Sequence, residues 1–218
     1  MQSTERAKKI FTILKKTYPN AHCALHHSNP LELLVATILA AQCTDERVNK
    51  VTPPLFKKYR SAADYAKANL KELEKEVRST GFYRQKAKSI KSVGGTLAER
   101  FHGKVPKTME ELVALPGVWR KTANVILNTA FGQPTIAVDT HIFRVGNRTG
   151  LARGKTPLAV ELKLDKATPQ PFRLHAHHWL ILHGRYTCKA RRPECWRCIV
   201  ADLCAYKPKT PPPRTATA

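Results

Sequence analysis

The sequence predicts an all-α protein, and three observations support this fold class. Apolar residues recur at the spacing of amphipathic helices through most of the 218 residues. Residues that begin and end helices separate these segments at short intervals. No run of alternating apolar residues is long enough for a strand, and the nearest candidate, residues 135–138, is too short. With 42% hydrophobic residues, the chain can build one or two packed helical domains.

The N-terminal part of the chain contains three predicted helix starts. The first helix has an apolar face and is followed by Pro19; that face consists of Ala7, Ile10, Phe11 and Leu14. Asn29 followed by Pro30 is typical of a helix N-terminus, and it opens the apolar run 31–41. Thr44, which two acidic residues follow, predicts the start of the next helix.

Two more helices are predicted over residues 70–78 and 84–101. Gly81 lies just beyond the first and is typical of a helix C-terminus. The Gly94-Gly95 pair is expected to interrupt the second, because glycine disfavours a helix interior. Thr108 and Glu111 have the spacing of a capping box, which predicts a helix start there.

The charge of the chain indicates a polyanionic partner. The formal net charge is +22, and basic residues occur along the whole length instead of in one tail. Nucleic acid is the first candidate for such a protein, and a broad basic face suits a phosphate backbone. A solvated basic surface or attraction to anionic lipid would also account for the charge. No apolar stretch reaches the length of a membrane span, so no membrane segment is expected.

Four cysteines lie within seventeen residues near the C-terminus: Cys188, Cys195, Cys198 and Cys204. Four thiolates so close in sequence can surround one metal centre, and the spacing fits an iron–sulfur cluster. Zinc is an alternative, although zinc ribbons usually contain two C-x2-C pairs and this segment has one. Disulfides are a third, but the N-terminal residues lack the features of a secretory signal. Cys23 and Cys43 are expected to be buried thiols.

A helical hairpin is predicted over residues 109–131. A short helix at 109–114 leads into the turn Leu115-Pro116-Gly117-Val118-Trp119, and a longer helix follows until Gly132. A tight turn that enters a helix presents unpaired backbone N–H groups to which a phosphate can bind. Gly117 would allow positive φ and a close approach of the phosphate. Taken alone, the pattern could be any connection between two helices.

Joined with other segments, the hairpin resembles the endonuclease III family of helix-hairpin-helix DNA glycosylases. The matching segments are residues 41–45, 115–132, 134–145 and 177–188, together with the cysteine spacing. The resemblance extends over nearly the whole chain. It implies two helical lobes with DNA in the groove between them, and a monomer. Residues 22–133 would form a six-helix barrel with the hairpin, and residues 1–21 plus 134–206 would form the lobe of a 4Fe–4S cluster held by the four cysteines. Residues 207–218, rich in Pro, Thr and Lys, are expected to be disordered.

The resemblance also implies a mechanism. Lys121 matches the family's nucleophile and Asp139 the aspartate that assists it. A lysine amine can attack C1′ of a flipped nucleotide, expel the base and form a Schiff base, and β-elimination then cuts the strand. The function expected is a bifunctional glycosylase and AP lyase acting on duplex DNA with oxidised pyrimidines or abasic sites. Asp139 is also expected to cap a helix beginning near Thr140, so it could serve as a cap, in catalysis, or in both.

Further DNA contacts follow from the same resemblance. Gln42 would fill the space of the flipped base, and Phe82, where leucine is common, would wedge into the other strand. Gly117 and Arg120 would contact DNA at the hairpin. Lys189, Arg191 and Arg192 lie in the Cys188–Cys195 loop and would contact phosphates, although a solvated loop is the alternative. His141 could be a site residue or a buried, hydrogen-bonded histidine.

Trp119 departs from the family pattern, which has glycine at this position. A positive φ at Trp119 would add backbone strain and weaken the hairpin's contact with phosphate. Alternatively, the indole packs on the DNA backbone. Three other functions stay open: a mismatch adenine glycosylase, a non-catalytic iron–sulfur DNA-binding protein, and a zinc-bound RNA-binding module. Two features oppose the mismatch adenine glycosylase: Lys121 is present, which a monofunctional enzyme does not need, and no room remains for a C-terminal recognition domain. The location expected is the cytoplasm of a prokaryote, associated with DNA.

Overall fold

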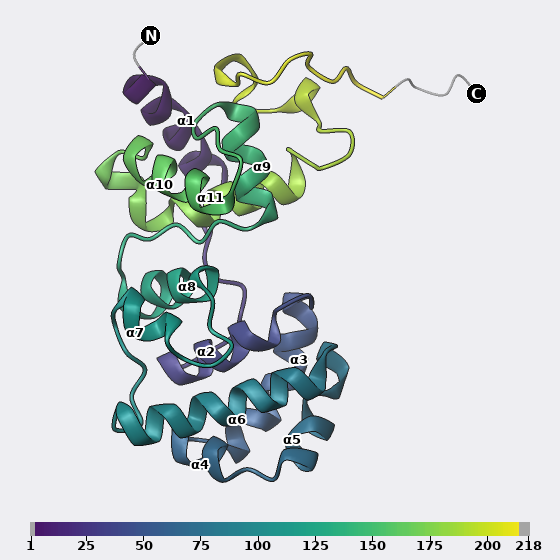
Figure 1. Ribbon diagram of the computed structural model, residues 1–218. Helices are drawn as coiled ribbons and strands as arrows, with labels where there is room; N and C mark the ends of the chain where they lie inside the picture. Colours follow the sequence, from purple (N-terminus) through teal and green to yellow (C-terminus); the bar gives the residue numbers. More distant parts are fainter. Residues whose placement is uncertain (1–2, 214–218) are drawn as a thin grey trace, which may run out of the picture. The chain divides into compact units, whose positions relative to one another are not determined.

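The computed structural model describes residues 3–213, and the described chain is built from helices without a single strand (Figure 1). The predicted all-α class is therefore confirmed. The helices are α1 (Ser3–Thr17), α2 (Pro30–Leu39), α3 (Asp45–Lys58), α4 (Ala62–Lys67), α5 (Leu70–Glu76), α6 (Tyr83–Arg100), α7 (Met109–Val113), α8 (Arg120–Phe131), α9 (Thr140–Thr149), α10 (Pro157–Ala167) and α11 (Arg173–Tyr186). Short 3-10 helices are η1 (Arg78–Thr80), η2 (Gln170–Phe172), η3 (Cys195–Arg197) and η4 (Ala201–Leu203).

The chain divides into two compact units, each with its own hydrophobic core. The first, which we call the hairpin unit, consists of residues 23–133. The second, the cysteine unit, joins residues 1–22 to residues 134–218. The N-terminal helix thus packs with the C-terminal region, although more than a hundred residues separate them in sequence.

The hairpin unit is organised around α6, its longest helix. Helix α4 packs along α6, and α2 packs against α6, α3 and α8. The core between these helices is almost wholly aliphatic, and its fully buried side chains include Leu33, Leu34, Leu39, Leu55, Leu73, Ile90, Leu97 and Leu112. Burial of this apolar surface is the main favourable contribution to folding.

Helix α6 runs without a break through Gly94-Gly95, so the interruption expected from the sequence is wrong. Gly94 is needed for packing instead. A Cβ at this position would lie 2.7 Å from the Ala62 carbonyl oxygen, 2.7 Å from Tyr65 Cβ and 2.9 Å from the Ala66 nitrogen. Tertiary contact between α4 and α6 therefore outweighs the poor helix propensity of glycine.

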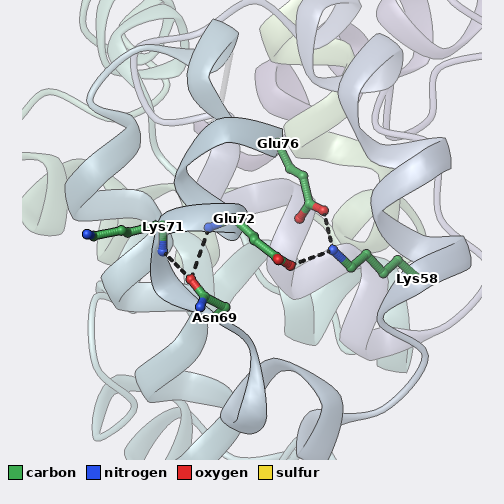
Figure 2. A network of polar contacts seen from close by, with 5 residues as sticks. All are labelled: Lys58, Asn69, Lys71, Glu72 and Glu76. Atoms are coloured by element: carbon green, nitrogen blue, oxygen red, sulfur yellow. Dashed lines mark hydrogen bonds and ion pairs between the residues drawn. The ribbon is translucent and has the colours of Figure 1, made fainter.

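Two predicted caps of the hairpin unit, at Asn29 and Thr44, are confirmed. The side chains of Asn29 and Thr44 accept hydrogen bonds from the first turns of α2 and α3. Asn69 caps α5 in the same way, and Figure 2 shows its side-chain oxygen accepting from the backbone nitrogens of Lys71 and Glu72. Each such cap satisfies backbone donors that have no partner within the helix.

An ion-pair network on the surface joins the end of α3 to α5 (Figure 2). Lys58 Nζ donates to Glu76 Oε1 at 2.7 Å and to Glu72 Oε2 at 3.1 Å. Both hydrogen bonds raise the pKa of Lys58 above its ordinary value, and the bond to Glu76 has the larger effect. Because the network is exposed, it contributes little to stability.

The cysteine unit has α1 as part of its core. The predicted apolar face of α1 is confirmed, since Ala7, Ile10, Phe11 and Leu14 are all at most 1% exposed. These residues pack with α10 and α11. At the start of the same helix, Arg6 donates hydrogen bonds to the backbone carbonyls of Thr149, Gly150 and Leu203 at 2.8–2.9 Å. One guanidinium therefore ties α1 to the end of α9 and to the cysteine-rich segment.

The tail contains no helix over residues 207–213. Residues 214–218 lie outside the described chain, and the predicted disorder of residues 207–218 stays a prediction. None of the described helices is long and apolar enough to cross a membrane.

The two adjacent glycines of α6 give a matched test of its packing. We expect Gly94→Ala to lower the free energy of unfolding by about 1–3 kcal/mol, because the new methyl group collides with the α4 backbone. Gly95→Ala meets nothing within 4 Å and should be neutral or stabilise by about 0.5–1 kcal/mol, because alanine favours a helix. Urea denaturation followed by circular dichroism measures both. Equal effects of the two variants would contradict the packing role of Gly94.

Candidate functional site

The predicted hairpin is present, with α7 and α8 joined by residues 114–119. Gly117 has φ of +74°, as a turn glycine was expected to have. Its missing side chain also has a packing role, since a Cβ there would lie 2.8 Å from Ser89 Oγ of α6. The turn is thus held directly against α6. Any larger residue at position 117 would meet both backbone strain and steric conflict.

The N-terminus of α8 is suited to bind an anion. Trp119 occupies the N-cap position and makes no side-chain capping hydrogen bond. Backbone N–H groups at the start of a helix have no partner within the helix and attract phosphate. The net positive end of the helix dipole adds to this attraction. The hairpin therefore presents a phosphate-binding geometry directly before Lys121.

The backbone strain considered for Trp119 is wrong. Its φ is −98° and its ψ is 165°, an extended conformation open to any residue. The positive φ of the turn falls on Gly117 instead. The indole is 79% exposed. Trp119 lies at the end of the hairpin turn, and its large apolar ring faces solvent. It is therefore available to pack on another molecule.

An open groove in the hairpin unit brings Trp119 together with other predicted DNA contacts. Its lining includes Gln42, Phe82, Gly117 and Trp119. These residues come from three separate segments, namely the α2–α3 loop, the start of α6 and the hairpin turn. Lys86 also lines the groove, and the sequence analysis did not single it out. A lysine within an amphipathic helix gives no sequence signal that distinguishes it from a surface charge.

Gln42 and Phe82 share an unusual backbone conformation. Both are left-handed, with φ of +53° and +47°, and neither is glycine. Both are exposed, and Phe82 is 68% exposed. A left-handed conformation costs energy in a residue with a side chain, and it persists where neighbouring structure imposes it. Each residue lies just outside a helix and lines the groove.

The predicted catalytic residues lie at helix N-termini in different units. Lys121 is exposed in the first turn of α8, in the hairpin unit. Burial raises the pKa of the Cys23 thiol, and the positive charge of Lys121 partly opposes that rise. Asp139 is the N-cap of α9 in the cysteine unit, and its Oδ1 accepts from the Ile142 nitrogen at 2.8 Å. The predicted capping role of Asp139 is confirmed.

His141 lies in the first turn of α9 and is half-buried. Its Nδ1 is 3.2 Å from Nη2 of Arg144 on the next turn. That guanidinium also donates to the backbone carbonyls of Gly184 and Cys188, each at 2.8 Å. His141 is therefore hydrogen-bonded, as expected if its role is structural. Its partner Arg144 also bonds to the carbonyl of Cys188, the first of the four cysteines.

The four C-terminal cysteines line one pocket together with Arg148 and His183, and none of them is in a disulfide. Among the described residues, no three His, Cys, Asp or Glu side chains are arranged to hold a single metal ion. Zinc would require thiolates converging on one point at about 2.3 Å. Four thiols that share one pocket without converging on a single point fit a group with several metal atoms, such as an iron–sulfur cluster.

Arg148 organises the loop between the first two cysteines. Its guanidinium donates to the carbonyls of Lys189 and Ala190 at 2.6 and 3.0 Å, and it lies 3.7 Å from Cys188 Sγ. Its backbone carbonyl accepts from Cys204 Sγ at 3.5 Å. Arg148 is not among the residues predicted from the sequence. Its spacing of four residues from Arg144, on one face of a helix, was the available signal.

The buried His183 and the partly buried Cys198 are neighbours at the same pocket. His183 Nε2 lies 3.7 Å from Cys198 Sγ. Burial lowers the pKa of His183 to about 4, so the imidazole is neutral at physiological pH. Burial also raises the pKa of the Cys198 thiol, which disfavours the thiolate unless a metal compensates. The donor set is therefore suited to a metal group and unsuited to free thiolates.

The three loop cations expected to contact phosphate are exposed, but one has a partner. Lys189 Nζ donates to Glu194 Oε1 at 2.7 Å, and Arg197 Nε donates to Glu194 Oε2 at 2.6 Å. Both hydrogen bonds lower the pKa of Glu194, and the bond from Lys189 has the larger effect. Arg191 and Arg192 lie at the tip of the loop, where Arg192 is left-handed with φ of +49°.

Comparisons with known proteins agree with this geometry. Residues 35–170 match the HhH-GPD superfamily base excision DNA repair proteins, and residues 188–204 match the iron–sulfur binding domain of endonuclease III. The endonuclease III of Haemophilus influenzae is 49% identical over 96% of this chain and 99% of its own length. That of Escherichia coli K12 is 49% identical over 92% of this chain and 95% of its own.

Two solved structures have the same fold. A trapped covalent endonuclease III–DNA intermediate matches with a TM-score of 0.87 and 46% identity, over 94% of this chain and 96% of the other. A non-covalent endonuclease III–DNA complex matches with the same TM-score and 47% identity, over the same shares. The iron–sulfur prediction is thereby confirmed over zinc and disulfides. This chain belongs to the endonuclease III family, whose members are DNA glycosylases and AP lyases of base excision repair that bind DNA and carry a 4Fe–4S cluster.

Proposed function

We propose that this enzyme removes oxidised pyrimidines from duplex DNA and then cleaves the strand through a Schiff base on Lys121. It acts as a monomer on DNA in the cytoplasm of a prokaryotic cell. The observation that carries the proposal is the position of Lys121. It is exposed in the first turn of α8, directly after a turn whose geometry suits a DNA phosphate. A phosphate bound there would bring a neighbouring sugar to the amine.

The reaction begins with the Lys121 amine, which must be neutral to attack. Its lone pair forms a bond to C1′, and the bond between C1′ and the base breaks, so that the base leaves with the electron pair and takes up a proton. Opening of the sugar ring gives a protonated Schiff base. Loss of a proton from C2′ then expels the 3′ phosphate, and water hydrolyses the Schiff base to free Lys121.

Asp139 supports this chemistry through charge. A carboxylate near the sugar stabilises positive charge that develops on C1′ as the base leaves. Its Oδ1 already accepts the capping hydrogen bond from Ile142, which fixes the orientation of the group. Oδ2 would then face the sugar and stabilise its charge, while the capping hydrogen bond to Oδ1 holds the carboxylate in place.

Gln42, Phe82 and Trp119 would separate the target base from the stack. The base cannot react inside the duplex, so it must be flipped out and its place filled. All three residues line one groove of the hairpin unit. Gln42 can hydrogen-bond to the unpaired partner base, and Phe82 can stack on the neighbouring one. Arg120 and the loop residues Arg191 and Arg192 would contact phosphates.

Cys188, Cys195, Cys198 and Cys204 would hold the 4Fe–4S cluster. The cluster would order the C-terminal segment and with it the cationic loop, as metal binding does in small metal-dependent domains. Arg148 and His183 hold this segment from the helices beside it.

Borohydride trapping tests the central role of Lys121. We expect a covalent adduct with duplex DNA containing one oxidised pyrimidine or one abasic site, and none with Lys121→Ala. Lys75→Ala, which removes another exposed lysine of the hairpin unit, should trap like the parent enzyme. Duplexes with an oxidised purine, or with adenine in a mismatch, test specificity. Adduct formation by Lys121→Ala would refute the assignment, and preference for the mismatched adenine would refute the substrate class.

Trp119→Gly tests whether the exposed indole binds DNA. Stacking on a base or sugar contributes roughly 1–3 kcal/mol, so we expect the variant to bind lesion duplex about tenfold more weakly. Trp119→Phe keeps an aromatic face and should retain most of the affinity. Fluorescence anisotropy measures both. Unchanged affinity and turnover in Trp119→Gly would show that the departure from the family glycine is neutral.

A further inference from the structure

Lys86 is a buried lysine whose two hydrogen bonds go to backbone carbonyls. It lies in the first turns of α6 and is 5% exposed. Its Nζ donates to the Leu39 carbonyl at 2.8 Å and to the Thr80 carbonyl at 2.7 Å. Burial lowers its pKa from the ordinary value. An aliphatic residue would fill a buried position at less cost in desolvation, so the charged head requires an explanation.

The two acceptors explain why a cation suits this place. Leu39 is the last residue of α2, and Thr80 is the last residue of η1. The final carbonyls of a helix have no partner within it and carry the negative end of its dipole. A lysine ammonium carries several donors on one atom and can bond to two such ends at once. Lys86 thereby links two segments that are 41 residues apart in sequence.

Both linked segments lead directly into the residues proposed to enter DNA. Gln42 follows Leu39 by three residues, and Phe82 follows Thr80 by two. Gln42 and Phe82 are the residues of this groove other than glycine that have positive φ, and Lys86 lines the same groove. Left-handed residues need a support that outweighs their backbone cost. The Lys86 ammonium anchors each segment just before its left-handed residue.

We propose that Lys86 is a positioning residue, which holds the Gln42 and Phe82 segments together so that both side chains enter the DNA at the same lesion. This inference rests on the DNA contacts proposed above for Gln42 and Phe82. Lys86 touches neither the target base nor the sugar in this role. It fixes the separation of two inserting groups before DNA binds, and so lowers the entropy lost when they insert.

A double-mutant cycle tests this role. The readout is the ratio of affinities for a duplex with a tetrahydrofuran abasic analogue and for the same duplex undamaged, measured on the cluster-loaded enzyme. Lys86→Met keeps the side-chain length but removes the donors, and we expect it to lower the ratio about tenfold. In the Gln42→Ala/Phe82→Ala background, the same substitution should change the ratio less than about twofold, because nothing is left to position. Lys86→Arg, which keeps charge and donors, should restore part of the ratio.

Lys91→Met is the matched control. Lys91 lies on the same helix, and its Nζ donates to the Ala68 carbonyl at 2.6 Å, but that carbonyl precedes no inserting residue. We expect Lys91→Met to leave the ratio unchanged.

Four results would overturn the inference. Lys86→Met could weaken binding to both duplexes equally, or its effect could persist in the Gln42→Ala/Phe82→Ala background. Lys86→Met and Lys86→Gln could both fail to fold, as thermal unfolding would show, and Lys86 would then serve general stability. If Gln42→Ala/Phe82→Ala alone leaves the ratio unchanged, the proposed DNA contacts fail first, and the role of Lys86 fails with them.

Discussion

The close approach of other backbones to α6 is the constraint on which the hairpin unit depends. The α4 backbone meets α6 at Gly94, where a single methyl group would collide. The hairpin turn meets it where Gly117 lies against Ser89. The ends of α2 and η1 meet it at Lys86, through hydrogen bonds from one ammonium group. One helix thus contacts the hairpin and both segments proposed to enter DNA. At these three places a glycine or a lysine donor allows the other backbone to come close.

The cysteine unit solves a different problem, because its C-terminal segment contains only short 3-10 turns. Arginine side chains from helices hold it by its backbone. Arg6 of α1 donates to the Leu203 carbonyl, and Arg144 and Arg148 of α9 donate to carbonyls at the first cysteine and the loop after it. Guanidinium groups suit this task because each offers several donors in a fixed geometry. These contacts help to place the four thiols around one pocket.

Local signals made most of the fold predictable. The caps at Asn29, Thr44 and Asp139 use side chains next to the helices they begin, so a few adjacent residues carry the information. Contacts between distant segments were not predictable in this way. Gly94 reads as a helix breaker until the α4 backbone is beside it. The sequence allowed a positive φ at Gly117 and left it open at Trp119; in the structure it falls on Gly117 alone of these two residues. Lys86 and Arg148 look like surface cations until their carbonyl partners, far away in sequence, are known.

The central claim is that the hairpin turn delivers one particular amine, Lys121, to the sugar of a bound lesion. Mass spectrometry of the borohydride-reduced complex tests it most directly, because proteolysis and fragmentation locate the attached sugar on the chain. The account predicts that the modified residue is Lys121, in the first turn of α8. Attachment at another lysine or at the N-terminal amine would contradict it, since the geometry of the hairpin would then not determine which amine reacts.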